Sequence, residues 1–278
     1  MTGRVEGQVA LITGAGRGQG RSHAVRLAEE GADIIALDLC QPVAGVPYKM
    51  STSEDLKDTA RAVEALGRRA YVAEVDVRDL AALTEVVTHA VGELGRLDLV
   101  SANAGIAGPF SPADETDAED WRTTVDINLT GVFNAARAAI PHIKAGGRGG
   151  SIVLTSSMAG LKPYLNAVHY VSAKHGVVGL MKALALELAP HSIRVNSLHP
   201  TQVDTPMIQN QAMYDLFCPD VENPTKADFE AASRATNAMP VPWVESIDVS
   251  NALLFLASDD ARYITGAAIP VDAGCGLL

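Results

Sequence analysis

Short apolar runs alternate along the whole chain with longer segments of helical periodicity, and this alternation restricts the fold more than any other feature. The helical segments place apolar residues at i, i+3 and i+4, and two of them end at Gly31 and Gly95, which suit helix C-caps. The apolar runs lack polar alternation, which is typical of strands buried on both faces of a parallel sheet. They predict strands over residues 8–13, 33–38, 70–75, 97–102, 151–156, 193–198 and 267–272.

This βαβ succession predicts an α/β fold, in which a doubly wound, seven-stranded parallel sheet carries helices on both faces. The 278 residues contain no linker, low-complexity tract or internal repeat, and 47% of them are hydrophobic, which is enough for a sizeable core. We therefore expect a single domain over residues 1–278.

The charge balance restricts the partners. Thirty-three acidic and 22 basic residues give a net charge of −11, and no cluster of Lys and Arg supplies the basic footprint that nucleic acid or an anionic membrane needs. A small-molecule partner is favoured. Cys40, Cys218 and Cys275 are odd in number and far apart, so we expect reduced thiols, neither disulfides nor a metal site.

The first apolar run starts at Val9, too early and too short for a signal peptide. No window approaches the roughly 18 apolar residues of a membrane span. We expect a cytoplasmic protein that does not enter membranes.

A glycine-rich turn, TGAGRGQG from Thr13 to Gly20, joins the first predicted strand to the first predicted helix. Gly14, Gly18 and Gly20 suit a tight turn whose N–H groups approach a pyrophosphate at a helix N-terminus, because a Cβ would block both. An isolated turn of this kind can also be an ordinary loop. Its place after a strand and before a helix favours a nucleotide site.

Asp38 ends the second predicted strand, 18 residues after Gly20, close to the spacing of the acid that hydrogen-bonds an adenosine ribose. A carboxylate there accepts from the 2′-hydroxyl and repels a 2′-phosphate, which favours NAD over NADP. Arg17 instead favours NADP, since a guanidinium can pair with a 2′-phosphate. We give Asp38 more weight, because an arginine in a solvated turn has many uses.

A second constellation lies in YVSAKHG, where Tyr170 and Lys174 are four residues apart and share one face of a helix. An ammonium beside a phenol lowers the phenol pKa from near 10 toward the range of a general base. Ser157, at the end of the fifth predicted strand, could steady the oxygen of an alcohol or carbonyl, and its spacing fits better than that of Ser156. Tyr-x-x-x-Lys alone would be an ordinary helix face, but with Ser157 and the nucleotide turn the catalytic interpretation is favoured.

With these motifs the chain resembles the short-chain dehydrogenase/reductase family over nearly its whole length. The resemblance rests on TGAGRGQG, Asp76-Val77, Asn103-Ala104-Gly105, NLTGVF from Asn128, Ser157, YVSAK from Tyr170 and HPTQVDTPM from His199. It implies a Rossmann fold, a homotetramer and hydride transfer with NAD.

The resemblance also assigns roles. The catalytic residues would be Asn128, Ser157, Tyr170 and Lys174, with Asn128 helping to hold a water in a proton relay behind the lysine. The cofactor would contact Gly14, Arg17, Gly18, Gly20, Asp38, Asp76, Val77, Asn103, Ala104, Gly105, Tyr170, Lys174, Pro200, Val203 and Thr205. Asp76 would meet the adenine and Thr205 the nicotinamide carboxamide. Pro200-Thr201 replaces the usual Pro-Gly, which affects the expected shape of the nicotinamide end.

Residues 39–50 are too long for a simple connection between the second strand and a helix capped by Ser51. Two prolines and a glycine argue against helix, yet Val43, Val46, Tyr48 and Met50 are too apolar for a solvated loop. Because the segment leaves the strand directly after Asp38, we expect it to fold over the adenine half of the cofactor. A passive surface insertion is the alternative, since lengthening a loop costs only about 0.6 kcal/mol per doubling.

This insertion, with HPTQVDTPM and the long segment after it, resembles the mycofactocin-associated, carveol-dehydrogenase-like branch of the family. In that branch the resemblance implies that NAD stays bound and is reoxidised in place by another redox carrier.

The segment 205–245 is also too long for a connection, and we expect it to act as a substrate lid. Its apolar residues are Met207, Ile208, Met213, Tyr214, Leu216, Phe217, Met239 and Trp243. Some of these must be ordinary core or subunit contacts. Methionines with aromatics suit a bulky apolar alcohol of terpene or steroid type better than a sugar.

We therefore predict an NAD-dependent oxidoreductase that interconverts a hydrophobic secondary alcohol and its ketone. The alternatives are an NADP-dependent ketone reductase, favoured only by Arg17, and a non-catalytic NAD-binding sensor on the same fold. A sensor has no need of the phenol of Tyr170, so the intact set of Ser157, Tyr170 and Lys174 argues against it.

Overall fold

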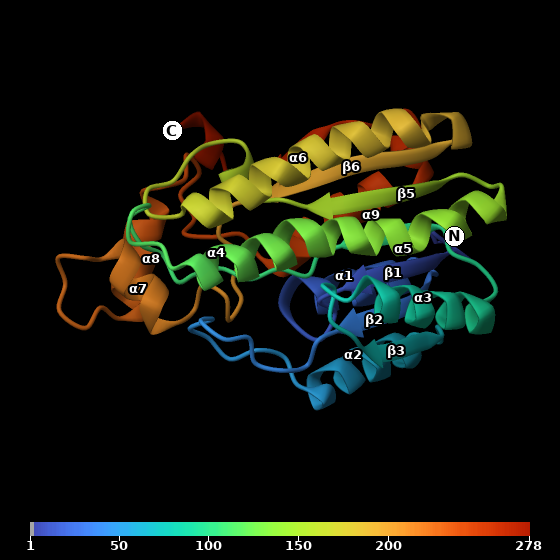
Figure 1. Ribbon diagram of the computed structural model, residues 1–278, viewed down its shortest axis with the longest axis horizontal. Coiled ribbons are helices and arrows are strands. Elements are labelled where there is room, and N and C mark those ends of the chain that lie inside the picture. Colours follow the sequence, from blue (N-terminus) through green and yellow to red (C-terminus); the bar gives the residue numbers. More distant parts are fainter. Residues whose placement is uncertain (1–2) are drawn as a thin grey trace.

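A computed structural model describes residues 3–278, and its centre is one seven-stranded parallel sheet with the strand order β3-β2-β1-β4-β5-β6-β7 (Figure 1). The strands are β1 (Val9–Thr13), β2 (Asp33–Asp38), β3 (Ala70–Glu74), β4 (Leu99–Ala102), β5 (Gly150–Thr155), β6 (Ile193–Pro200) and β7 (Ala268–Val271). These bounds lie within two residues of the predicted ones.

The helices fall between the strands and in the segment after β6. They are α1 (Gly18–Glu29), α2 (Ser53–Ala65), α3 (Leu80–Leu94), α4 (Ala118–Val125), α5 (Gly131–Gly146), α6 (Val168–Leu188), α7 (Gln211–Phe217), α8 (Lys226–Arg234) and α9 (Ser246–Ala257). A π-helical turn, η1 (Asp126–Thr130), joins α4 to α5. Short 3₁₀ turns are η2 (Met158–Gly160), η3 (Ala189–His191), η4 (Asp259–Ala261) and η5 (Cys275–Leu277).

Two apolar cores cover the two faces of the sheet. Side chains of α3, α5 and α6 pack on one face, where Val87, Ala135 and Met181 are fully buried. Side chains of α1, α2 and α9 pack on the other, where Leu27 and Leu254 are likewise buried. The predicted single-domain, doubly wound Rossmann-type fold is confirmed.

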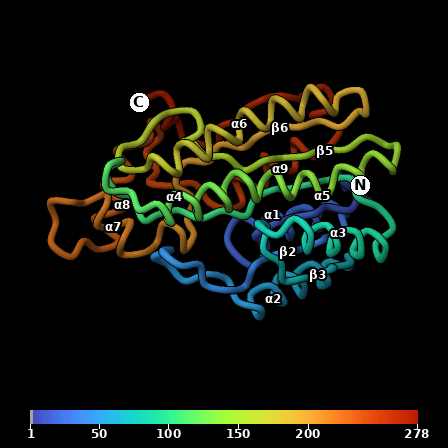
Figure 2. The backbone as a smooth tube through the Cα atoms, in the orientation of Figure 1, coloured from blue at the N-terminus to red at the C-terminus, as the bar shows by residue number. Residues whose placement is uncertain are grey.

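The strand order reverses at β1, which pairs with β2 on one side and β4 on the other. At such a switch point the two crossover connections leave in opposite directions, so a crevice opens beyond the carboxyl ends of the strands. The insertion after β2 and the segment holding α7 and α8 both lie beyond these ends (Figure 2). Among the described residues no helix has the length and apolar character needed to span a bilayer.

The helix ends largely follow the predicted caps. Gly95 is the left-handed C-cap of α3 with φ of 88°, and Gly31, with φ of 95°, follows the C-cap of α1 by one residue. The prediction that Ser51 caps the next helix is wrong. Thr52 is the N-cap of α2 and forms a capping box with Asp55, which leaves the Ser51 hydroxyl for another partner.

Candidate active site

A cavity opens at the switch point, and most of the predicted cofactor residues line it. Its walls are Gly14, Arg17, Gly18, Gln19, Gly20, Asp38, Leu39, Val43, Met50, Ser51, Asp76, Val77, Asn103, Ala104, Gly105, Ile106, Ile127, Thr205, Pro206 and Met207. The carboxyl ends of β1 to β4, the insertion after β2, the π-helical turn η1 and the segment after β6 supply these residues. The topology thus brings together motifs that lie almost 200 residues apart.

The glycine turn has the shape that a bound pyrophosphate requires. A Cβ on Gly20 would lie 2.0 Å from the carbonyl oxygen of Gly14, so the turn closes only with glycine there. Gly18, with φ of 50°, would place a Cβ 3.1 Å from the methyl group of Thr205, which packs across the turn. Gly18, Gln19 and Gly20 line the cavity where α1 begins, and a helix N-terminus of this kind fits the phosphates of a dinucleotide.

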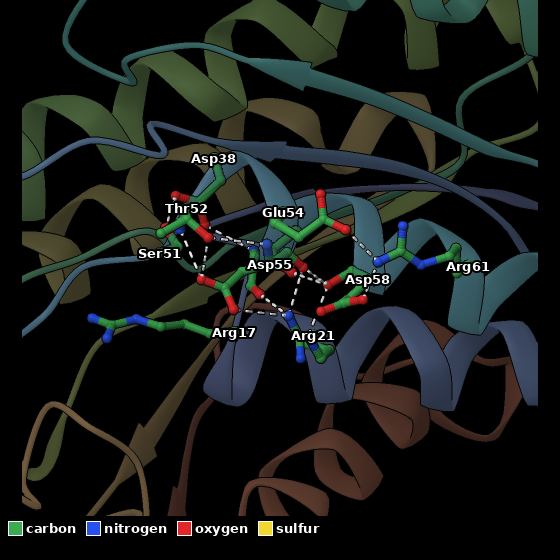
Figure 3. Close-up of polar contacts among 12 residues, drawn as sticks. Arg17, Arg21, Asp38, Ser51, Thr52, Glu54, Asp55, Asp58 and Arg61 are labelled. Carbon is green, nitrogen blue, oxygen red and sulfur yellow. Dashed lines mark hydrogen bonds and ion pairs between the residues drawn. The ribbon is translucent and has the colours of Figure 1, made fainter.

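Asp38 joins the glycine turn to the insertion (Figure 3). Its carboxylate accepts hydrogen bonds from the Gly16 amide at 2.8 Å, from the Ser51 hydroxyl at 2.6 Å and from the Cys40 amide at 3.2 Å. The side chain remains on the wall of the cavity, where a carboxylate can accept from a ribose 2′-hydroxyl. A 2′-phosphate would meet like charge.

Arg17 is held by the insertion. Its guanidinium lies over the ring of Tyr48, 5.5 Å from the centroid, donates to the Lys49 carbonyl and reaches the sulfur of Met50 at 3.7 Å. Figure 3 shows the side chain directed away from Asp38 and Ser51. The guanidinium that could have paired with a 2′-phosphate is thus engaged by the chain itself.

Three residues that we did not single out from the sequence hold the cofactor wall. The Thr13 hydroxyl accepts from the amides of Asn103 and Ala104, both at 3.1 Å, and fixes the turn after β4. Arg21 donates to the Gly16 carbonyl at 2.6 Å. Arg78 forms an ion pair with Asp76; burial alone would raise the pKa of that carboxyl, but the hydrogen bonds from Arg78 lower it.

The predicted catalytic tyrosine and lysine lie together at the start of α6. The Lys174 ammonium lies 5.6 Å from the centroid of the Tyr170 ring and donates to the Thr155 carbonyl at 3.0 Å. Lys174 is 4% exposed, and burial lowers its pKa to about 8. An ammonium near its titration range can lose or regain a proton at moderately alkaline pH.

The pKa of Tyr170 is shifted in the direction opposite to the expected one. Burial raises it above the ordinary value of 10, and a hydrogen bond with Ser157 opposes this rise. Desolvation disfavours the phenolate more than the hydrogen bond with Ser157 favours it. The protein's own groups therefore keep Tyr170 protonated at neutral pH.

Ser157 is placed from two sides. Its hydroxyl accepts from the Ala159 amide at 3.1 Å and so caps η2. Its carbonyl accepts from His199 Nδ1 at 2.8 Å, while His199 Nε2 lies 2.8 Å from the Ser197 hydroxyl. Nδ1 must donate to the carbonyl; burial lowers the His199 pKa and so favours the neutral imidazole, in which Nε2 accepts from Ser197. Ser156 instead donates to the Lys174 carbonyl at 2.9 Å, away from Tyr170.

Asn128 lies on the π-helical turn η1, a feature that is frequent at functional sites. Its amide group donates to the Ile106 carbonyl and accepts from the Ile106 amide, both at 2.8 Å. Gly105 faces both the Asn128 oxygen and the Lys174 ammonium, since a Cβ there would lie 3.2 and 3.6 Å from them. Asn128 thus lies behind the lysine, and its part in a proton relay stays a prediction.

Four expected cofactor residues lie off the cavity wall: the neighbouring Tyr170 and Lys174, described above, and Pro200 and Val203. Pro200 ends β6 opposite Val271. Val203 is 4% exposed, packs in the core beside α9 and pairs with Val244. Their assignment to the cofactor stays a prediction.

The expected lid divides into two groups. Tyr214, Phe217 and Trp243 surround the fully buried Phe229, with ring centroids 5.0, 5.3 and 5.8 Å from its own, and so form a small core between α7 and α8. Ile208 is buried and Met239 is exposed. Met207, Met213 and Leu216 instead line a second cavity beside the first.

The fold, the glycine turn and the Ser, Tyr and Lys set define an oxidoreductase of one family, and the chain belongs to the short chain dehydrogenases, whose model matches residues 8–214. It is 66% identical over 275 residues to a (-)-trans-carveol dehydrogenase of Rhodococcus erythropolis, covering 99% of each chain. The expected carveol-dehydrogenase-like resemblance is thus confirmed.

Two crystal structures resemble this one closely. A carveol dehydrogenase from Mycobacterium avium in complex with NAD has a TM-score of 0.99 and 55% identity over 100% of both chains. A short chain dehydrogenase from Mycobacterium paratuberculosis bound to NAD has a TM-score of 0.91 and 45% identity, covering 99% of this chain and 100% of that one.

Proposed function

We propose that the protein is an NAD-dependent alcohol dehydrogenase that interconverts a hydrophobic secondary alcohol of the carveol type and its ketone. The observation that carries this proposal is the meeting of Tyr170, Ser157 and Lys174 beside a cavity that is lined by the glycine turn and Asp38. The relatives named carveol dehydrogenase support the substrate class.

Bound NAD supplies the hydride acceptor, nicotinamide C4. In the reducing direction the protonated Tyr170 would donate its Oη proton to the ketone oxygen. In the oxidising direction its phenolate form would take the hydroxyl proton of the alcohol while the hydride leaves the carbinol carbon with both bonding electrons, so the raised pKa makes oxidation depend on alkaline pH. The Ser157 hydroxyl lies close enough to Tyr170 to lower its pKa, and from there Ser157 would orient the alcohol oxygen. Lys174, buried between Thr155 and the tyrosine ring, places a positive charge next to the developing phenolate.

The choice of NAD over NADP follows from Asp38 and Arg17. Asp38 presents a carboxylate where a 2′-phosphate would lie, and Arg17 is held by the insertion. The NAD-bound structural relatives agree with this choice. The NADP-dependent reductase thereby loses its one supporting observation, and a sensor would not need the Tyr170 and Lys174 pair.

A kinetic survey tests the proposal. Purified protein is assayed with NAD and NADP over cyclic terpenols, cyclohexanol and polyols, and both reaction directions are followed at 340 nm. We expect the highest kcat/KM with a cyclic terpenol and NAD. Higher values for polyols, or for NADP, would contradict the proposal, and an absence of turnover with any alcohol would favour a sensor.

Further parts of the proposal rest on the family resemblance. We infer that the protein is cytoplasmic and that it forms a homotetramer. Light scattering of the purified protein tests the tetramer. We also infer that NAD stays bound in the manner of the mycofactocin-associated branch and that another redox carrier reoxidises it in place. Multiple turnovers with an artificial electron acceptor and no added NAD would support this, whereas a strict need for added NAD would contradict it.

A further inference from the structure

The insertion after β2 reaches beyond the cofactor cavity. Leu39, Val43 and Met50 of the insertion line that cavity, but Pro47 and Tyr48 border a separate cavity of about 270 Å³. The walls of this second cavity are Pro47, Tyr48, Ala107, Gly108, Pro109, Phe110, Met207, Ala212, Met213 and Leu216. Three segments that are distant in the sequence therefore enclose it: the insertion, the loop after β4 and the start of the lid.

The second cavity adjoins the catalytic centre. Phe110 presents its ring edge-on to Tyr170, with centroids 6.3 Å apart. Met207 belongs to the walls of both cavities, so they are neighbours. An alcohol whose oxygen meets Tyr170 would extend its apolar part into this space, whose volume is close to the roughly 300 Å³ of a small ligand site.

Contacts with two other segments fix the position of the Tyr48 side chain. Its hydroxyl accepts from the Ala107 amide at 3.0 Å, and its ring carries the Arg17 guanidinium on one side. The side chain is 9% exposed, and burial raises its pKa to about 12 although the Ala107 hydrogen bond and the Arg17 charge lower it. Pro47 packs on the next turn of backbone, since a Cβ on Gly108 would lie 3.6 Å from its ring.

We propose that Pro47 and Tyr48 are specificity-determining residues, which form one wall of the alcohol site and set the size of the ring that it accepts. This inference rests on the proposed function, because the cavity is taken to hold the alcohol. It assigns the insertion a second task beside the cofactor. The tyrosine ring gives the wall its bulk, and the Arg17 guanidinium and the Pro47 contact with Gly108 hold the ring in place without the hydroxyl.

The test compares Tyr48→Ala, which removes the bulk, with Tyr48→Phe, which keeps the ring. Val43→Ala is the matched control, because Val43 belongs to the same insertion, is equally buried and borders only the cofactor cavity. For each variant, kcat/KM is measured with a cyclic terpenol, with cyclohexanol and with a bulkier steroid alcohol at saturating NAD. Thermal melting and the Kd for NAD monitor folding and cofactor binding.

We expect Tyr48→Ala to change the steroid-to-cyclohexanol ratio of kcat/KM by at least about tenfold in favour of the larger ring, since a few methylene-sized contacts give 10–200-fold discrimination. Tyr48→Phe and Val43→Ala should keep the ratio within about threefold. An unchanged ratio in Tyr48→Ala, or an equal change in the control, would overturn the proposal. If Tyr48→Ala does not fold, Pro47→Ala takes its place with the same expected direction.

The proposed function and this inference fail separately. Wild-type protein that turns over no alcohol refutes the function. The wall is then judged by calorimetry, from the ratio of Kd values of a cyclic terpenone and cyclohexanone for NAD-loaded wild type and variants. A ratio that Tyr48→Ala leaves unchanged refutes the wall. Turnover with an unchanged ratio refutes the inference alone.

Discussion

Replacement of Asp38 should reduce stability and cofactor discrimination together, because one carboxylate performs two tasks. It is 9% exposed, and it accepts hydrogen bonds from the amides of Gly16 and Cys40 and from the Ser51 hydroxyl. Asp38→Ala leaves the Gly16 N–H and the Ser51 hydroxyl without this acceptor. Asp38→Asn keeps an oxygen for Gly16 but removes the charge and replaces the second acceptor oxygen, which serves Ser51 and Cys40, by an NH2 donor.

The expected magnitudes follow from these contacts. Hydrogen bonds to charged groups contribute about 1.5–3 kcal/mol each, and removal of the carboxylate also relieves the cost of burying its charge. We therefore expect Asp38→Ala to lose at least about 2 kcal/mol of unfolding free energy, or roughly 4 °C or more in Tm. Two charges 4 Å apart near a protein surface interact by about 4 kcal/mol, so loss of this repulsion should raise the NADP-to-NAD ratio of kcat/KM at least tenfold.

Calorimetric melting of the protein stripped of nucleotide gives the stability, and initial rates with each cofactor give the ratio. Asp38→Asn should change the ratio as much as Asp38→Ala but lose less in Tm. An Asp38→Ala variant with wild-type Tm would refute the structural task. A ratio unchanged in both variants would refute the assignment of Asp38 to the ribose.

The other predictions concern catalysis, the insertion and pH. Tyr170→Phe keeps the ring but removes the ionisable hydroxyl, so turnover should fall at least about 100-fold with little change in NAD affinity; near-normal turnover would rule out the assignment. Protein purified without added nucleotide should carry NAD, and replacing residues 41–50 by a short Gly/Ser turn should speed its release in stopped-flow fluorescence; cofactor-free protein and an unchanged rate would leave the insertion passive. Burial lowers the pKa of His23 to about 3 from 6.5, so the unfolded state binds the extra proton and stability should fall as the pH drops from about 6.5 toward 3. His23→Gln, which can still bond the Ser250 hydroxyl, should lose less Tm between pH 7 and 5 than wild type; equal losses would contradict this account.

The candidate site could be predicted from the sequence where a motif has its own local geometry. The spacing of Gly14, Gly18 and Gly20 predicts a tight turn with no room for a Cβ. Tyr170 and Lys174 share a face because any helix places residues i and i+4 together. Partners at long range leave no such pattern. His199 bonds the Ser157 carbonyl from another strand, and nothing in its own neighbourhood of the sequence announces this.

By itself the sequence determined the architecture. Periodicity and turn residues are local properties of the chain, and a parallel βαβ succession has few ways to bury its apolar runs, so the sheet, its two helical layers and the crevice at the switch point follow. Tertiary structure alone decided where the insertion packs. The pKa of Tyr170 rises because of burial that no spacing reveals, and Arg17 and Ala107 meet Tyr48 only when β1, β2 and β4 lie side by side. A contact between distant segments depends on where the whole fold brings them, and therefore the wall of the second cavity became visible only in three dimensions.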